Sequence, residues 1–129
     1  YKRQEVHLVG VQPEKSPEMV RSVEKGSILT EDISQPTLSD GTAGGIEPGS
    51  VTFPMCRNLV DEWWLASEDA IALEIRDLLA QQQILAEGSA VLPLAYLRAH
   101  AEKWANRKVV AVLTGKRIPL PKVQKIICS

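Results

Sequence analysis

Three side chains in this sequence stand where an α/β protein usually carries its chemistry: Asp40, Glu87 and Thr114. Thr114 closes a β-branched apolar run and is followed by Gly115. Glu87 precedes the small residues of a helix start, and Asp40 lies in a long loop. Ligands of open α/β sheets bind at the carboxyl ends of the strands, so one cleft could hold all three side chains. The alternative is that the threonine ends a strand, the glutamate begins a helix and the aspartate makes an Asx turn. From these residues alone, this alternative is favoured.

The loop around Asp40 is rich in glycine, because four of the eight glycines of the chain fall between residues 41 and 49. Such runs often wrap backbone N–H groups around a phosphate. No Walker motif, dinucleotide fingerprint or nucleophile elbow accompanies this one. His7 and His100 are far apart and belong to no His/Cys cluster, which argues against a zinc site. The three tryptophans are not interleaved with basic residues and are more typical of a core or an interface than of a base-stacking surface.

The elements that must position these residues alternate between strands and helices. Val6–Val11 is short and apolar on both faces, which predicts a buried parallel strand. A helix is expected to begin at Ser16-Pro17-Glu18, with Ser16 as its cap, and to end at Gly26. A long loop over 27–50 follows, then a helix from 52 or 53 to 59 or 60 and a strand over Glu62–Ala66. Ser67 caps an amphipathic helix, one face of which carries Ile71, Ile75, Leu78, Leu79 and Gln82. The last two elements are a helix over 90–104 and a buried strand over 108–114. This order predicts parallel βαβ units.

The composition is that of one globular domain. The chain has 129 residues, of which 44% are apolar and 24% charged. A net charge of -1 disfavours nucleic acid and anionic membrane as partners, and no apolar run could span a bilayer. The two cysteines form no disulfide framework, which favours a reducing compartment such as the cytoplasm. The chain begins almost directly in a strand and stops in a mixed basic-apolar tail, so we expect a piece of a longer chain or one with a replaced end.

Five segments, read in order, resemble the C-terminal part of the threonine/serine dehydratase and serine racemase family, the fold type II enzymes that use pyridoxal phosphate. VHLVGVQPEKSPEM resembles the family's V-x-G-V-E-P strand and the helix after it, and TLSDGTAGGIEPGSVTF resembles its T-I-A-D-G loop. LVDEWWLASEDAI resembles L-V-D-x-x-x-x-V-S-E-x-x-I, LAEGSAVLPLA resembles E-P-A/T-G-A, and VVAVLTGKRI resembles V-V-x-V-L-S-G-G-N. The resemblance ends after Ile118.

This resemblance implies roles for Asp40, Glu87 and Thr114. In the family, the lysine that forms the Schiff base and the tetraglycine loop that holds the cofactor phosphate lie upstream of the point where this chain starts. The glycine-rich stretch then corresponds to the loop at the active-site mouth, with Asp40 and Gly41 on the substrate side. Thr114, followed by Gly115, corresponds to the Ser or Cys that hydrogen-bonds the pyridine nitrogen. Glu87 corresponds to the glutamate near the cofactor ring.

The resemblance also implies a divalent-cation site, with departures. Its positions here are Gln12, Ser16 and Glu18, and the neutral Gln12 in place of a charged ligand predicts weak binding of a hard cation. Lys116 and Arg117 replace the usual Gly-Asn after Ser-Gly, so bulky cations could crowd or recharge the pocket floor.

Together these observations predict an α/β fold: a few-stranded parallel sheet with flanking helices, part of the large cofactor-binding domain. Residues 1–118 would belong to that domain and 119–129 to a divergent tail. The expected function is that of a C-terminal fragment of a pyridoxal-phosphate-dependent hydroxy amino acid dehydratase, incomplete without the missing N-terminal half or an oligomeric partner. The alternative is a non-catalytic binding or assembly module derived from the same fold.

Overall fold

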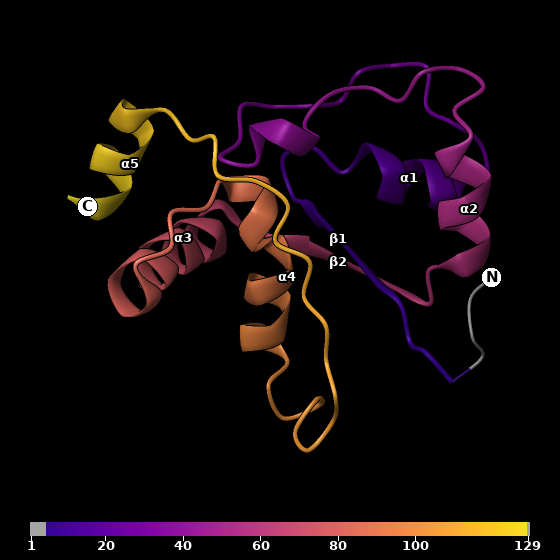
Figure 1. Cartoon of the computed structure of the whole chain (residues 1–129). Helices are drawn as coiled ribbons and strands as arrows, with labels where there is room; N and C mark the ends of the chain where they lie inside the picture. Colours follow the sequence, from indigo (N-terminus) through magenta and orange to yellow (C-terminus); the bar gives the residue numbers. More distant parts are fainter. Residues whose placement is uncertain (1–4, 129) are drawn as a thin grey trace.

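The computed structural model describes residues 5–128 of the chain. The elements, in order, are β1 (Val9–Pro13), α1 (Glu18–Lys25), the 3-10 turn η1 (Asp40–Thr42), α2 (Thr52–Leu59), β2 (Glu62–Ala66), α3 (Glu68–Gln82), α4 (Gly88–Ala99) and α5 (Leu120–Ile127) (Figure 1). In Figure 1, α1 and α2 lie on one side of the two strands and α3 and α4 on the other. Within the described range, no helix combines the length and the apolar character needed to cross a membrane.

The sheet consists of β1 and β2 in parallel, in a register that pairs Val9 with Glu62 and Pro13 with Ala66. The mixed α/β class and the parallel pairing are therefore confirmed. β1 begins three residues later than expected, and the expectation that it is buried is wrong, since only Pro13 of this strand is buried. A strand buried on both faces needs a layer of helices over each face, and a sheet of two strands gives little area for such layers.

The hydrophobic core forms where α3 and α4 pack against each other and against the strands. The expected helix after Ser67 is confirmed, because the Ser67 hydroxyl accepts a hydrogen bond from the Ala70 amide (3.2 Å) and caps α3. On its expected apolar face, Ile71 and Ile75 are completely buried, whereas Gln82 is exposed. α4 contributes most of the opposing surface. The core residues it shares with β2, α3 and α5 are Ala66, Ile71, Ile75, Ala86, Ala90, Val91, Leu92, Ala95 and Ile126.

α1 shows how a predicted helix can form with an unpredicted cap. It ends at Gly26, whose φ of 80° confirms the left-handed C-cap expected there. The prediction that Ser16 caps the helix is wrong, because its hydroxyl donates to Glu18 Oε2 (2.6 Å) instead. The side chain of Gln12 takes over part of that role, since its Oε1 accepts from the Val20 amide (2.9 Å). The N-terminus of α1 is thus satisfied from the end of β1.

Two expectations for the second half of the chain are wrong. α4 begins at Gly88 and ends at Ala99, so the helix expected over 90–104 stops five residues early and continues as a series of turns. Residues 108–114 form no strand, and Val110 and Val112 are 88% and 63% exposed. A β-branched run becomes a strand only when a neighbour completes its hydrogen-bond ladder, and in the described sheet β1 pairs with β2 alone.

Candidate functional site

The side chain of Glu87 is the centre of a site where three distant segments meet. One carboxylate oxygen, Oε1, accepts from the Ser89 hydroxyl (2.8 Å), and the other, Oε2, accepts from the backbone amide of Arg117 (2.9 Å). The Glu87 amide in turn donates to the carbonyl oxygen of Gly115 (3.2 Å). Gly115 allows this contact because a β-carbon there would lie only 2.5 Å from Glu87 Cδ and 2.7 Å from Oε2.

The loop that carries Asp40 and Gly41 closes the site from the other side. A β-carbon on Gly41 would lie 2.9 Å from Ser89 Oγ and 3.3 Å from Glu87 Oε1, so η1 rests against the start of α4. Gly88 approaches the backbone of this loop, since a β-carbon there would lie 2.5 Å from the carbonyl carbon of Leu38. The structure thus brings together the segments that carry Asp40, Glu87 and Thr114, the three residues that the sequence suggested one cleft could hold.

Thr114 stands at the open part of this site. It is exposed, and among residues 5–128 the structure gives its hydroxyl no hydrogen-bond partner. Its chain neighbour Gly115 is held against Glu87 by the hydrogen bond from the Glu87 amide and by the close approach of the carboxylate. Lys116 and Arg117 are exposed too, and Arg117 contributes its backbone amide to the site. Replacing Gly-Asn by Lys-Arg therefore leaves room for the contact with Glu87, because that contact uses the main chain.

The proposed cation ligands lie apart from Glu87, at the junction of β1, α1 and the glycine-rich loop. Gln12 uses its side-chain oxygen on α1, as described above, and Ser16 also accepts a hydrogen bond from the Gly44 amide (3.2 Å). Glu18 is 1% exposed, and its Oε1 has no hydrogen-bond partner in the described structure. Across residues 5–128 no group of three or more His, Cys, Asp or Glu side chains lies close enough to hold a metal ion. The cation site stays a prediction.

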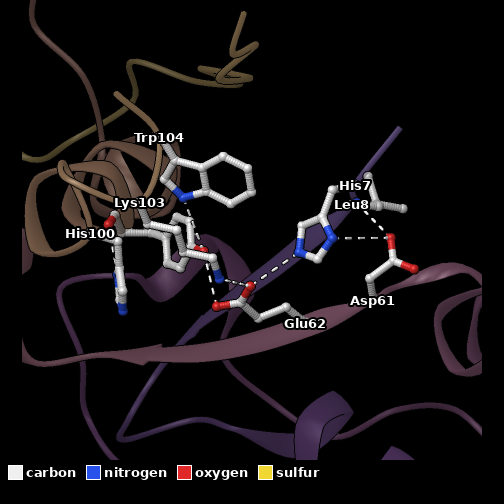
Figure 2. A network of polar contacts seen from close by, with 8 residues as sticks. His7, Leu8, Asp61, Glu62, His100, Lys103 and Trp104 are labelled. Carbon is white, nitrogen blue, oxygen red and sulfur yellow. Dashed lines mark hydrogen bonds and ion pairs between the residues drawn. The ribbon is translucent and has the colours of Figure 1, made fainter. Parts of the chain in front are cut away.

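A second polar cluster lies at the opposite end of the strands, and we call it the amino-edge cluster: His7, Glu62, Tyr96, Lys103 and Trp104 (Figure 2). The Glu62 carboxylate accepts hydrogen bonds from Lys103 Nζ and from the Tyr96 hydroxyl (3.0 Å), and lies 3.1 Å from His7 Nε2. The hydrogen bond from Lys103 is the main reason why the pKa of Glu62 falls from 4.5 to about 2. The same contact raises the pKa of Lys103. This cluster ties the end of α4 to β2, remote from the candidate site.

Comparison with known proteins identifies the class to which this fold and site belong. The family model for pyridoxal-phosphate dependent enzymes matches residues 1–115, so the chain belongs to that family, and the resemblance found in the sequence is confirmed.

Two curated relatives that align with the chain are named for their action on L-threonine. The chain is 36% identical over 122 residues to an L-threonine ammonia-lyase of Geobacter sulfurreducens, and 34% identical over 125 residues to the catabolic L-threonine dehydratase TdcB of Staphylococcus aureus. Each alignment covers 95% of this chain but only 30% and 36% of the relative, so the chain spans about a third of their length. Among solved structures, threonine deaminase isoform 2 from Solanum lycopersicum matches 94% of this chain and 35% of its own, with a TM-score of 0.83 and 26% identity.

The residues present fit the cofactor of this family at the ring side. A pyridine ring nitrogen needs one hydrogen-bonding group, and Thr114 offers an exposed hydroxyl without a protein partner in the described part of the chain. The missing β-carbon of Gly115 lets the Glu87 carboxylate lie against the backbone directly after Thr114. Thr114, Gly115 and Glu87 would thus hold the ring edge, whereas nothing within residues 5–128 was predicted to hold the phosphate.

Sequence reasoning missed three residues that hold the site together. Glu68 at the start of α3 accepts hydrogen bonds from the Thr37 hydroxyl (2.5 Å) and the Leu38 amide (2.8 Å), and so anchors the loop before η1. Ser89 and Lys122 are the other two: Ser89 holds Glu87, and Lys122 forms an ion pair with Asp40 (2.6 Å). Glu68 carried a visible signal as an acidic residue in a first helical turn, but that signal indicates only a helix N-terminus.

Proposed function

We propose that the full-length protein carrying this chain is a pyridoxal-phosphate-dependent dehydratase that removes water from L-threonine or L-serine and releases ammonia and a 2-oxo acid. The observation that supports this most is the 36% identity to an L-threonine ammonia-lyase over 95% of the chain. The meeting of the segments that carry Asp40, Glu87 and Thr114, through Gly41, Glu87 and Gly115, agrees with it. We place the protein in the cytoplasm because Cys56 and Cys128 are both free thiols.

In this proposal the chain's own residues tune the cofactor rather than carry the covalent chemistry. When bound, pyridoxal phosphate supplies the electron sink for a substrate that loses its α-proton. Thr114 would donate its hydroxyl hydrogen to the ring nitrogen, and a neutral hydroxyl does not protonate that nitrogen as a carboxylic acid can. The ring would stay a moderate electron sink, which favours loss of the β-hydroxyl. Glu87 would flank the ring, while Asp40 and Gly41 would border the substrate at the mouth.

The test is an assay of the full-length protein with L-threonine and L-serine. We expect cofactor-dependent formation of 2-oxobutyrate or pyruvate, together with ammonia in equal amounts. Chiral analysis of the remaining amino acid separates elimination from racemisation. A protein that retains the cofactor but forms neither 2-oxo acid would contradict the dehydratase, and a protein that binds no cofactor at all would favour the non-catalytic module.

A further inference from the structure

The loop over residues 37–44, which we call the mouth loop, is held at both ends by contacts that are at least partly buried. At its start, Glu68 accepts hydrogen bonds from Thr37 and Leu38. At its end, the Gly44 amide donates to the hydroxyl of the fully buried Ser16. Between these anchors, η1 rests on the start of α4 through Gly41. The mouth loop is therefore fixed at both ends by hydrogen bonds, while its middle is exposed to solvent.

One further contact reaches the middle of this span, and it comes from the tail of the chain. Lys122 Nζ lies 2.6 Å from Asp40 Oδ2, and the two side chains are 35% and 54% exposed. The helix that carries Lys122 is packed onto the protein, because Val123 and Ile126 of α5 are 7% and 4% exposed and Ile126 belongs to the core. In Figure 1, the chain leading into α5 passes the η1 turn before α5 packs beside α3. The charge pair thus joins a fixed helix to a loop.

We propose that Lys122 is a positioning residue: through Asp40 it holds the mouth loop against Glu87 and Ser89. The path is short, since Asp40 is the neighbour of Gly41 and Gly41 lies against both of those side chains. Because the pair is exposed, it is the one anchor of the loop that can open without disturbing the core. α5 would then act on the site through Lys122, while its buried side chains stay packed against α3 and the core.

The inference rests on the proposed function only for its catalytic consequence, and its main test is independent of activity. Hydrogen exchange in the mouth loop is measured by mass spectrometry on the full-length protein, as wild type and as Lys122→Met, which keeps the apolar stem and removes the charge. The matched control is Lys125→Met, because Lys125 lies on the same helix, is exposed and has no partner in the described structure. We expect exchange about two- to fivefold faster in Lys122→Met and unchanged in Lys125→Met, as loss of one exposed ion pair allows.

Three further measurements separate positioning from a general effect on folding. Lys122→Arg should restore slow exchange, and Asp40→Asn should add nothing to Lys122→Met, because both remove the same pair. At about 1 M salt, where the screening length is about 3 Å, wild type and Lys122→Met should exchange alike. In the dehydratase assay, Lys122→Met should raise KM by a similar factor and leave kcat nearly unchanged.

Equal exchange rates for wild type and Lys122→Met at low salt would overturn the inference, as would additive effects of the Lys122 and Asp40 substitutions. If the wild-type protein forms no 2-oxo acid but the exchange results hold, then the proposed function fails and the positioning role stands. If the wild-type protein is active but exchange is the same in Lys122→Met, then the proposed function stands and the positioning role of Lys122 fails.

Discussion

Gly88 and Gly115 support the same site, but their replacement by alanine should have different consequences. At Gly88 an added β-carbon meets backbone, with the carbonyl carbon of Leu38 at 2.5 Å and the amide nitrogen of Ser39 at 2.9 Å. Neither atom can rotate away. Overpacking costs about 1–3 kcal/mol, and a clash with fixed backbone lies at the upper end of that range, whereas alanine regains up to about 1 kcal/mol of helix propensity. Gly88→Ala should therefore lower the free energy of unfolding by about 2 kcal/mol.

At Gly115 the added β-carbon meets the carboxylate of Glu87, which is the far end of a flexible side chain. The carboxylate can swing out, at the expense of its hydrogen bonds to Ser89 and the Arg117 amide, each of which contributes about 0.5–1.5 kcal/mol. Both donors lie near solvent and can bind water instead, so Gly115→Ala should lower stability by only about 1 kcal/mol. If Glu87 flanks the cofactor ring as proposed, this substitution should weaken cofactor binding more than Gly88→Ala does at a temperature where both proteins are folded.

The matched control is Gly45→Ala, because a β-carbon at Gly45 meets no atom within 4 Å. Urea unfolding followed by tryptophan fluorescence measures stability, and a loss of 2 kcal/mol shifts the midpoint by about 1 M for a slope of about 2 kcal/mol per M. Cofactor affinity is measured by equilibrium dialysis on the full-length protein. If Gly88→Ala and Gly115→Ala lower stability equally and leave affinity equal, then the backbone and side-chain contacts assigned here are wrong.

Two further predictions concern single side chains. Glu62→Gln should lower the free energy of unfolding by about 1–2 kcal/mol at pH 7. This is less than the fall in the pKa of Glu62 from 4.5 to about 2 would give alone, because water screens the half-exposed Lys103. Because the pKa of Glu62 is lower in the folded than in the unfolded protein, the difference in the free energy of unfolding should persist above about pH 4.5 and vanish as the pH falls to about 2. Urea titrations at several pH values measure it. The exposed control Glu24→Gln should change the free energy of unfolding very little at any pH. Thr114→Ala should weaken cofactor binding by about 0.5–1.5 kcal/mol at unchanged stability, and Thr114→Ser should not; equal affinities for all three proteins would refute the ring-nitrogen role.

The sequence predicted those elements whose signals are local. β2 and the start of α3 were predicted to the residue, because Ser67 followed by two acidic residues specifies a helix N-terminus directly after an apolar run. The stretch 108–114 could not be judged in the same way. Its β-branched residues favour an extended backbone, but a strand also needs a partner, and no local pattern reveals whether one is present.

The residues of the candidate site also differ in whether a local sequence signal or a tertiary contact defines their role. Glu87 and Thr114 could be singled out because small residues surround them at the ends of predicted elements. The role of Ser16 was mistaken because its position suits a helix cap, whereas its hydroxyl joins Glu18 to Gly44, 28 residues away. Lys122 was outside the resemblance altogether, and its contact with Asp40 spans 82 residues. Contacts of this length depend on the tertiary fold, which local periodicity does not encode.

The two ends of the sheet are stabilised by different means, and the difference explains where the site lies. At the amino end, Glu62 has its carboxylate committed to Lys103, Tyr96 and His7, so this end has little freedom to accept a ligand. Beyond the carboxyl ends of the strands, the Glu87 carboxylate is held by the Ser89 hydroxyl and the Arg117 amide, and the hydroxyl of Thr114 has no protein partner within residues 5–128. A hydroxyl without a protein partner is available to a ligand, which is why the proposed site lies at this end of the sheet and not at the amino end.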